Sequence, residues 1–114
     1  MGSLGDLQHL VLLAVLRLGT EAYGVAVRDE IRRRAGRDLS LGAVYSALRR
    51  LEAQGLLIAS KGEPEPVTGG KAKTFFEATP AGFKALRQAQ RELRGLLEGL
   101  GELPLSSPRT RGEG

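Results

Sequence analysis

The segment from Ser40 to Glu52 constrains the fold most, because it predicts a helix with two contrasting faces. One stripe is apolar at helical spacing, formed by Leu41, Val44, Leu48 and Leu51. The opposite face begins with small residues and ends with arginines: Gly42, Ala43, Ser46, Arg49 and Arg50. A merely solvated helix would normally carry Glu, Lys and Gln there. Small residues followed by arginines favour close approach to another surface, and the DNA major groove, about 12 Å wide, suits such a helix.

Within this helix, Arg50 is expected to project directly opposite the apolar stripe and to contact a base or a phosphate. Arg49, on the flank, is expected to contact phosphate, and Ser46 could hydrogen-bond a base edge or a phosphate. Ser40 is a good N-cap. Tyr45 lies near the core side, so a buried ring with an outward hydroxyl fits both packing and phosphate contact. For each of these residues the alternative is an ordinary solvated or packed side chain.

The neighbouring segments predict a winged helix-turn-helix. A helix over residues 22–35 ends at Gly36, and the short turn to Ser40 fits a helix-turn-helix. Its arginine run, residues 32–34, is expected to be a solvated face with secondary phosphate contacts at best. Strands over residues 56–60 and 73–78 then predict a β-hairpin whose second arm carries Lys71 and Lys73.

Two further helices predict self-association. The helix over residues 4–18, stopped by Gly19, is apolar nearly all round, so its second face (Leu12, Leu13 and Leu16) is expected to meet another subunit. Thr79 and Pro80 begin a terminal helix. This helix carries a heptad seam of Phe83, Leu86, Gln90, Leu93, Leu97 and Leu100. Gln90 either sets the dimer register or lies in a frayed, partly exposed seam.

Composition narrows the class of function. A length of 114 residues indicates one folded unit, divided into a DNA-binding domain (1–79), a dimerisation helix (80–103) and a disordered tail (104–114). The net charge of +4 favours a polyanionic partner. Cysteine is absent and the single histidine, His9, has no ligand-spaced partners, so we expect no metal, no cofactor and no catalytic residues. The sequence has neither a long apolar run nor a signal-peptide pattern, which predicts a cytoplasmic protein without membrane contact.

About the first hundred residues resemble the PadR-like family of transcriptional regulators. The resemblance is strongest from Leu39 to Glu52, continues through Gly55-Leu56 and the segment 70–76, and ends at Thr79-Pro80-Ala81-Gly82. It implies a mainly α fold with a small β-hairpin: a winged helix-turn-helix and a C-terminal dimerisation helix. It also implies that the third helix enters the major groove, that the wing contacts the DNA backbone or the minor groove, and that Tyr23 and Tyr45 lie near phosphates. Ala72 and Thr74 depart from a richer basic run in the wing, which predicts fewer backbone contacts there.

These observations predict a homodimeric, sequence-specific DNA-binding repressor with a double-stranded, pseudopalindromic operator. A small-molecule effector would bind at the dimer interface. The alternative is a winged-helix protein–protein adaptor that does not bind DNA, and salt-dependent duplex binding separates the two. The chain has no Trp, so an aromatic drug pocket built on tryptophan cannot be carried over from the family.

Overall fold

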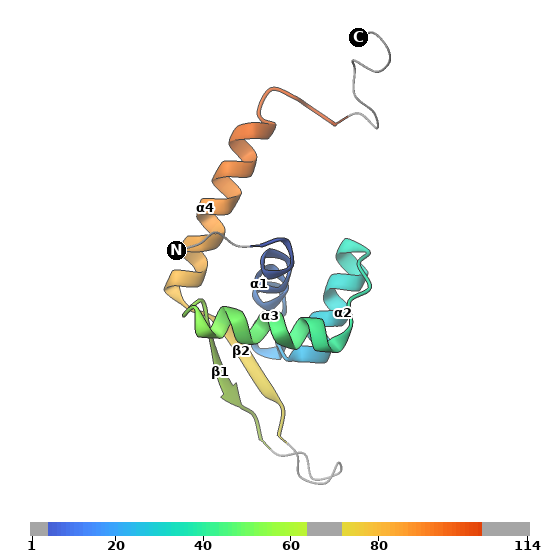
Figure 1. The fold of residues 1–114 in the computed structure, drawn as a ribbon, viewed down its shortest axis with the longest axis vertical. Helices are drawn as coiled ribbons and strands as arrows, with labels where there is room; N and C mark the ends of the chain where they lie inside the picture. The colour runs from blue at the N-terminus through green and yellow to red at the C-terminus, as the bar shows by residue number, and fades with distance from the viewer. Residues whose placement is uncertain (1–4, 64–71, 104–114) are drawn as a thin grey trace.

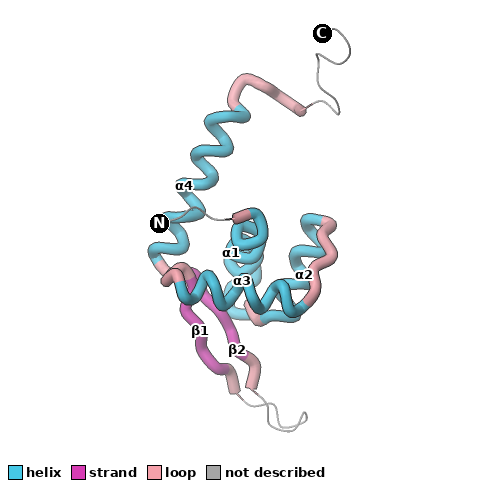
Figure 2. Tube along the Cα trace, viewed as in Figure 1, coloured by secondary structure: helices cyan, strands magenta, loops and turns pink. Residues whose placement is uncertain are grey.

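A computed structural model describes residues 5–63 and 72–103 of the chain. Within these residues, four α-helices and one antiparallel hairpin follow each other in the predicted order (Figures 1 and 2). The elements are α1 (Asp6–Leu18), the single-turn 3₁₀ helix η1 (Gly19–Glu21), α2 (Gly24–Ala35), α3 (Leu41–Ala53), β1 (Leu57–Lys61), β2 (Thr74–Ala78) and α4 (Pro80–Leu97). The predicted fold class, mainly α with a small hairpin, is confirmed.

The helix ends follow from local residue chemistry. Gly19 and Gly36 adopt positive φ of 58° and 69° where α1 and α2 end, which a residue without a Cβ does at little cost. The Thr79 hydroxyl accepts the Gly82 N–H at 3.0 Å, so the predicted cap of α4 is confirmed. The largest difference in boundary is the end of α4 at Leu97, short of residue 103, whereas α1 and α2 each begin two residues later than predicted.

The core lies where α1, α2, α3 and the hairpin meet, and its centre is α1 (Figure 1). Val11, Leu12 and Val15 are almost fully buried together with Leu48 and Leu51 of α3. Burying such side chains contributes about 1.5–3 kcal/mol each. This core fixes the relative positions of α2 and α3, which carry the candidate site.

The first turn of α4 is anchored on the turn between α3 and β1. The Thr79 N–H donates to the Leu56 carbonyl at 3.1 Å, and the Thr79 hydroxyl donates to the Gly55 carbonyl at 2.7 Å. Leu86 still packs against the core, and beyond it α4 leaves the body as an arm (Figure 1). Every residue from Gln90 to Leu97 is exposed, so this arm is largely uncovered.

Candidate nucleic-acid interface

Helix α3 buries one stripe and leaves the other face open. The Ser40 hydroxyl accepts the Ala43 N–H at 3.0 Å, which confirms Ser40 as the N-cap. Val44, Leu48 and Leu51 are fully buried as predicted. Ala47 is also buried, with 5% exposure, whereas Leu41 is only half-buried. The buried stripe is therefore turned toward Ala47 relative to the predicted one.

This rotation changes the expected roles of the two arginines. At roughly 100° per residue, the direction opposite the buried stripe is shared by Gly42, Ser46 and Arg49. Arg50 lies closer to the Ala47 side, at the edge of the exposed face. The expectation that Arg50 projects directly opposite the core was therefore wrong, because it took Leu41 rather than Ala47 as part of the stripe. Both arginines are exposed, and no ion pair to either is found among the residues that the structure describes.

The start of α3 can approach another surface closely. Gly42 is exposed, and a Cβ built on it would meet nothing within 4 Å. Ala43 is half-buried and Ser46 is exposed. The row from Gly42 to Arg49 therefore presents small side chains first and a guanidinium at its end, an arrangement that suits insertion into a groove.

Tyr45 connects α3 to the first turn of α2. Its half-buried ring lies against Gly24, where an added Cβ would be 2.8 Å from the ring atom Cε1. The glycine is thus required for the ring to pack there. The role of the Tyr45 hydroxyl at a phosphate stays a prediction.

Tyr23 and Lys73, predicted separately as DNA contacts, lie together near the loop end of the hairpin. The Lys73 ammonium Nζ is 4.3 Å from the centre of the Tyr23 ring. The same ring meets Phe75 edge to face, with ring centres 5.6 Å apart. Lys71 and the predicted loop tip lie outside the described residues.

The arginines of α2 are largely committed to carboxylates of the same protein. Glu30, only 6% exposed, accepts hydrogen bonds from Arg17 at 3.0 Å, from Arg34 at 3.2 Å and from Arg33. The Arg17 guanidinium, aided by Arg33 and Arg34, holds the pKa of Glu30 below its ordinary value even though burial opposes this. We define Glu30 with its three arginines as the Glu30 cluster.

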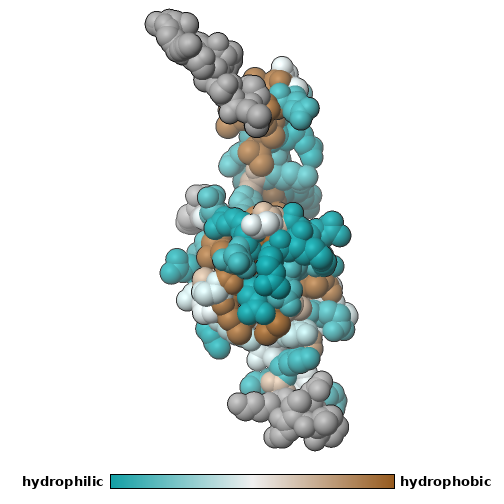
Figure 3. Space-filling model, turned by 90° about the vertical axis from the view of Figure 1, so that its right-hand side faces the viewer, coloured by the Kyte–Doolittle hydropathy of each residue, from teal (hydrophilic) through white to brown (hydrophobic). Residues whose placement is uncertain are grey.

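The Glu30 cluster was not found from the sequence, where the arginine run read as a solvated face. Arg32 likewise pairs with Asp29 at 3.2 Å. Figure 3 shows hydrophilic side chains covering the face that α2 presents. A carboxylate three or four residues before an arginine was the available signal, but the contact from Arg17 on α1 is long-range.

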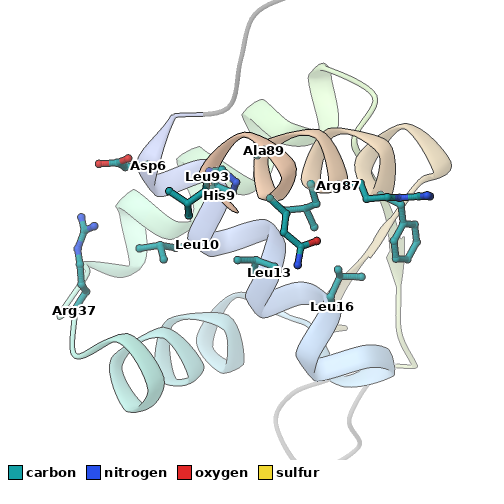
Figure 4. Close-up of a pocket in the computed structure, with 12 residues that line it drawn as sticks. Asp6, His9, Leu10, Leu13, Leu16, Arg37, Arg87, Ala89 and Leu93 are labelled. Atoms are coloured by element: carbon teal, nitrogen blue, oxygen red, sulfur yellow. The ribbon is translucent and has the colours of Figure 1, made fainter. Parts of the chain in front are cut away.

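A groove of about 640 Å³ lies along the outer face of α1, between it and α4 (Figure 4). Leu10, Leu13 and Leu16 line it from α1, and its other lining residues include Arg37, Phe83, Leu86, Arg87, Gln90 and Leu93. Leu13 and Phe83, which both line the groove, are 46% and 47% exposed, so two large apolar side chains are left partly open to solvent there. Several residues predicted at the dimer interface therefore line one concave groove.

The structure turns two predicted interface residues inward and places a third outside α4. Leu12 is fully buried in the protein's own core, because the side of α1 that carries Val11 and Val15 turns inward. Leu86 is 8% exposed and packs against the same core. Leu100 lies beyond the end of α4, after Gly99, whose φ is 85°.

The outer seam of α4 remains uncovered. Leu93 and Leu97 are 61% and 39% exposed, and Gln90, which lines the groove together with Leu93, is exposed as well. Leu96, at 81% exposure, lies off the heptad seam and was not predicted. An apolar row of this kind on a projecting helix indicates that another surface covers it.

The residues that the structure describes hold no group of three or more His, Cys, Asp or Glu side chains placed to bind a metal ion. Among them, no helix is long and apolar enough to cross a membrane.

Comparison with known proteins places this geometry in a family context. Residues 12–88 match the family model described as the transcriptional regulator PadR-like family. The transcriptional regulator Rv3488 of Mycobacterium tuberculosis is 38% identical over 76 residues, which cover 67% of this chain and 66% of that relative. The chain thus spans just under two thirds of the relative's length.

Solved structures show the same fold. A PadR family regulator from Eggerthella lenta superposes with a TM-score of 0.63 and 30% identity, covering 81% of this chain and 78% of that one. A PadR family regulator from Clostridium difficile R20291 superposes with a TM-score of 0.68 and 22% identity, covering 81% and 91%. At 22% identity, the similarity to the Clostridium difficile regulator shows a shared fold and no more.

Proposed function

Since this chain belongs to the PadR-like family of DNA-binding transcriptional regulators, we propose that it acts as a homodimeric repressor on a pseudopalindromic operator. The members of this family are transcriptional regulators and not enzymes. Membership therefore favours DNA binding over the alternative function, a protein–protein adaptor that does not bind DNA. In our proposal α3 enters the major groove, the hairpin serves as the wing, and α1 with α4 forms the dimer interface.

The observation that carries the proposal is the open row on α3 from Gly42 through Ser46 to Arg49. Its members are exposed, and the small residues come before the arginine along the helix. An arginine can donate two hydrogen bonds to guanine, the commonest specific contact in the major groove. We assign base reading to Arg49, and phosphate contact to Arg50, Ser40 and Tyr45 around it.

The first test is DNA selection with the purified protein, followed by titration of the selected duplex at several salt concentrations. We expect a pseudopalindromic duplex whose affinity falls steeply with salt, because bound cationic side chains release counterions. Lack of any enriched sequence, or binding that is independent of salt, would contradict the proposal. Placing the selected duplex over a reporter promoter tests repression, and increased expression would argue against it.

The proposed dimer covers the exposed row of α4 and the α1 groove with the same surfaces of a second copy. An isologous contact of this kind brings two α3 helices to half-sites about one helical turn apart or a multiple of it. Leu93→Arg places a charge in the proposed interface, whereas Gln88→Arg places the same charge on the opposite side of the helix. Sedimentation should show monomers for the first variant and dimers for the second. Equal dimerisation of the two would place the interface elsewhere.

We further propose that a small-molecule effector binds in the groove between α1 and α4. A volume of about 640 Å³ is within the range of small-molecule sites, about 300–1,000 Å³, and its floor is apolar. A ligand there contacts both helices of the proposed interface, so it can alter the spacing of the two α3 helices. Screening for compounds that release the selected duplex tests this, and Leu13→Trp, which fills the groove, should abolish the response. A compound that still releases DNA from this variant binds elsewhere.

A further inference from the structure

The Lys73 side chain extends from the loop end of the hairpin to Tyr23, the residue directly before α2. Its ammonium lies 4.3 Å from the centre of the Tyr23 ring, within the distance at which a cation is attracted to the face of an aromatic ring. Tyr23 is half-buried and Lys73 is exposed. The lysine is therefore held on its inner side, while its outer side remains available to a ligand.

The Tyr23 ring is itself fixed by the hairpin and by α2. Tyr23 forms an isolated antiparallel bridge with Phe75, and the Phe76 N–H donates to the Ala22 carbonyl at 2.9 Å. The Phe75 ring meets the Tyr23 ring at an interplanar angle of 78°, the edge-to-face geometry that aromatic pairs prefer. Because backbone and side chain both hold it, the ring can serve as a platform for the lysine.

We propose that Tyr23 is a positioning residue for DNA binding: its ring holds the Lys73 ammonium at the phosphate backbone, and its hydroxyl is not the contact. A lysine side chain loses rotational freedom when it binds a phosphate. A side chain already held in place has less freedom left to lose. The inference rests on the proposed contact between wing and DNA, and it assigns the start of α2 and the wing to one phosphate-binding unit.

The size of the effect is bounded by the cation–π attraction. The ring can favour the held position only by that attraction, about 0.5–1 kcal/mol at an exposed site, which is roughly a two- to fivefold change in affinity. Removal of the lysine should also change the salt dependence of the affinity. It deletes a phosphate contact, so it should lower the salt slope by about 0.9.

The test measures affinity for the duplex that the wild-type protein selects from a random pool. Tyr23→Leu should weaken binding about two- to fivefold with an unchanged salt slope, because the lysine still reaches the phosphate. Tyr23→Phe keeps the ring and should bind like the wild type. In a Lys73→Met background, Tyr23→Leu should have no further effect.

Lys61→Met is the matched control, because Lys61 is an exposed lysine on the other strand of the wing. In this background Tyr23→Leu should keep its full two- to fivefold effect. If Tyr23 merely supported the wing, its substitution would still weaken binding in both lysine backgrounds, because the remaining wing contacts would depend on it. Equal behaviour of the two backgrounds therefore overturns the inference.

A loss in Tyr23→Phe equal to that in Tyr23→Leu also overturns it, because the hydroxyl would then be the contact. Should Tyr23→Leu fail to fold, pentafluorophenylalanine at position 23 keeps the shape and removes the negative ring face. It should show the two- to fivefold loss, and affinity equal to that of Tyr23→Phe would count against the inference. Absence of any duplex binding by the wild type would refute the proposed function and this inference together. If the losses from Tyr23→Leu and Lys73→Met simply add in the double variant, only the inference is refuted.

Discussion

Two glycines in α4 lie in different surroundings, so the same substitution should have opposite effects on stability. Gly82 is buried in the first turn, and a Cβ there would collide with the Leu56 carbonyl oxygen and lie 3.3 Å from its carbon. Gly95 is exposed, and a Cβ there would meet nothing within 4 Å. Alanine is favoured over glycine in a helix interior by about 1 kcal/mol, so this gain applies at both positions. Only Gly82→Ala adds a collision with rigid backbone.

The cost at Gly82 follows from the contacts that hold α4. The Leu56 carbonyl accepts the Thr79 N–H at 3.1 Å, so moving the helix away to make room strains this bond. Overpacking costs about 1–3 kcal/mol, and a weakened hydrogen bond costs about 1 kcal/mol more. Subtracting the helix gain of about 1 kcal/mol leaves a net destabilisation of roughly 1–3 kcal/mol. Gly95→Ala should stabilise by up to about 1 kcal/mol.

Urea unfolding followed by circular dichroism, at one protein concentration, measures both changes. The two midpoints should move in opposite directions from that of the wild type. A Gly82→Ala variant as stable as Gly95→Ala would refute the reasoning, because α4 would then not be anchored against the α3–β1 turn as described.

Three further predictions concern α2 and α3. Glu30→Gln should destabilise the protein near neutral pH. Because the pKa of Glu30 is lowered in the fold, the carboxylate stabilises the fold fully at pH values above its ordinary, unfolded pKa. The stability difference between variant and wild type should therefore shrink as pH falls through the lowered pKa, and a difference independent of pH in acid titrations would contradict this. Ser40→Ala removes the hydroxyl that accepts the Ala43 N–H, and it should lower the free energy of unfolding by about 1 kcal/mol in the same assay. An unchanged free energy of unfolding would mean that this cap does not stabilise α3. Gly42→Gln should fold normally, because its Cβ position is open, yet lose binding to the selected duplex; retained affinity would show that this end of α3 stays away from DNA.

Local chemistry made much of the fold predictable. The caps at Ser40 and Thr79 and the stop at Gly36 depend on a few neighbouring residues, and each was predicted from the sequence. The order of helices and hairpin followed from hydrophobic spacing and turn residues. These signals depend on residues that are close together in the chain, so they can be recognised in the sequence without knowledge of the tertiary structure.

The errors arose where several faces of a helix are apolar or where distant segments meet. Helix α1 is apolar nearly all round, so its helical wheel could not show that Leu12 turns inward. Ala47 gave too weak a hydrophobic signal to locate the buried stripe of α3, so the directions in which Arg49 and Arg50 project were misplaced. The contact of Lys73 with Tyr23 depends on how the hairpin docks on α2, and such a long-range arrangement has no local pattern.

The most direct test of the account is to compare the DNA sequences selected by the wild type, Arg49→Ala and Arg50→Ala. The wild type should select a pseudopalindrome. Arg49→Ala should lose base preference at one symmetric pair of positions, with a cost of about 1–3 kcal/mol per contact, whereas Arg50→Ala should weaken binding similarly for all sequences. Unchanged preference in Arg49→Ala, or loss of preference at positions without two-fold symmetry, would contradict the claim that paired α3 helices read the operator.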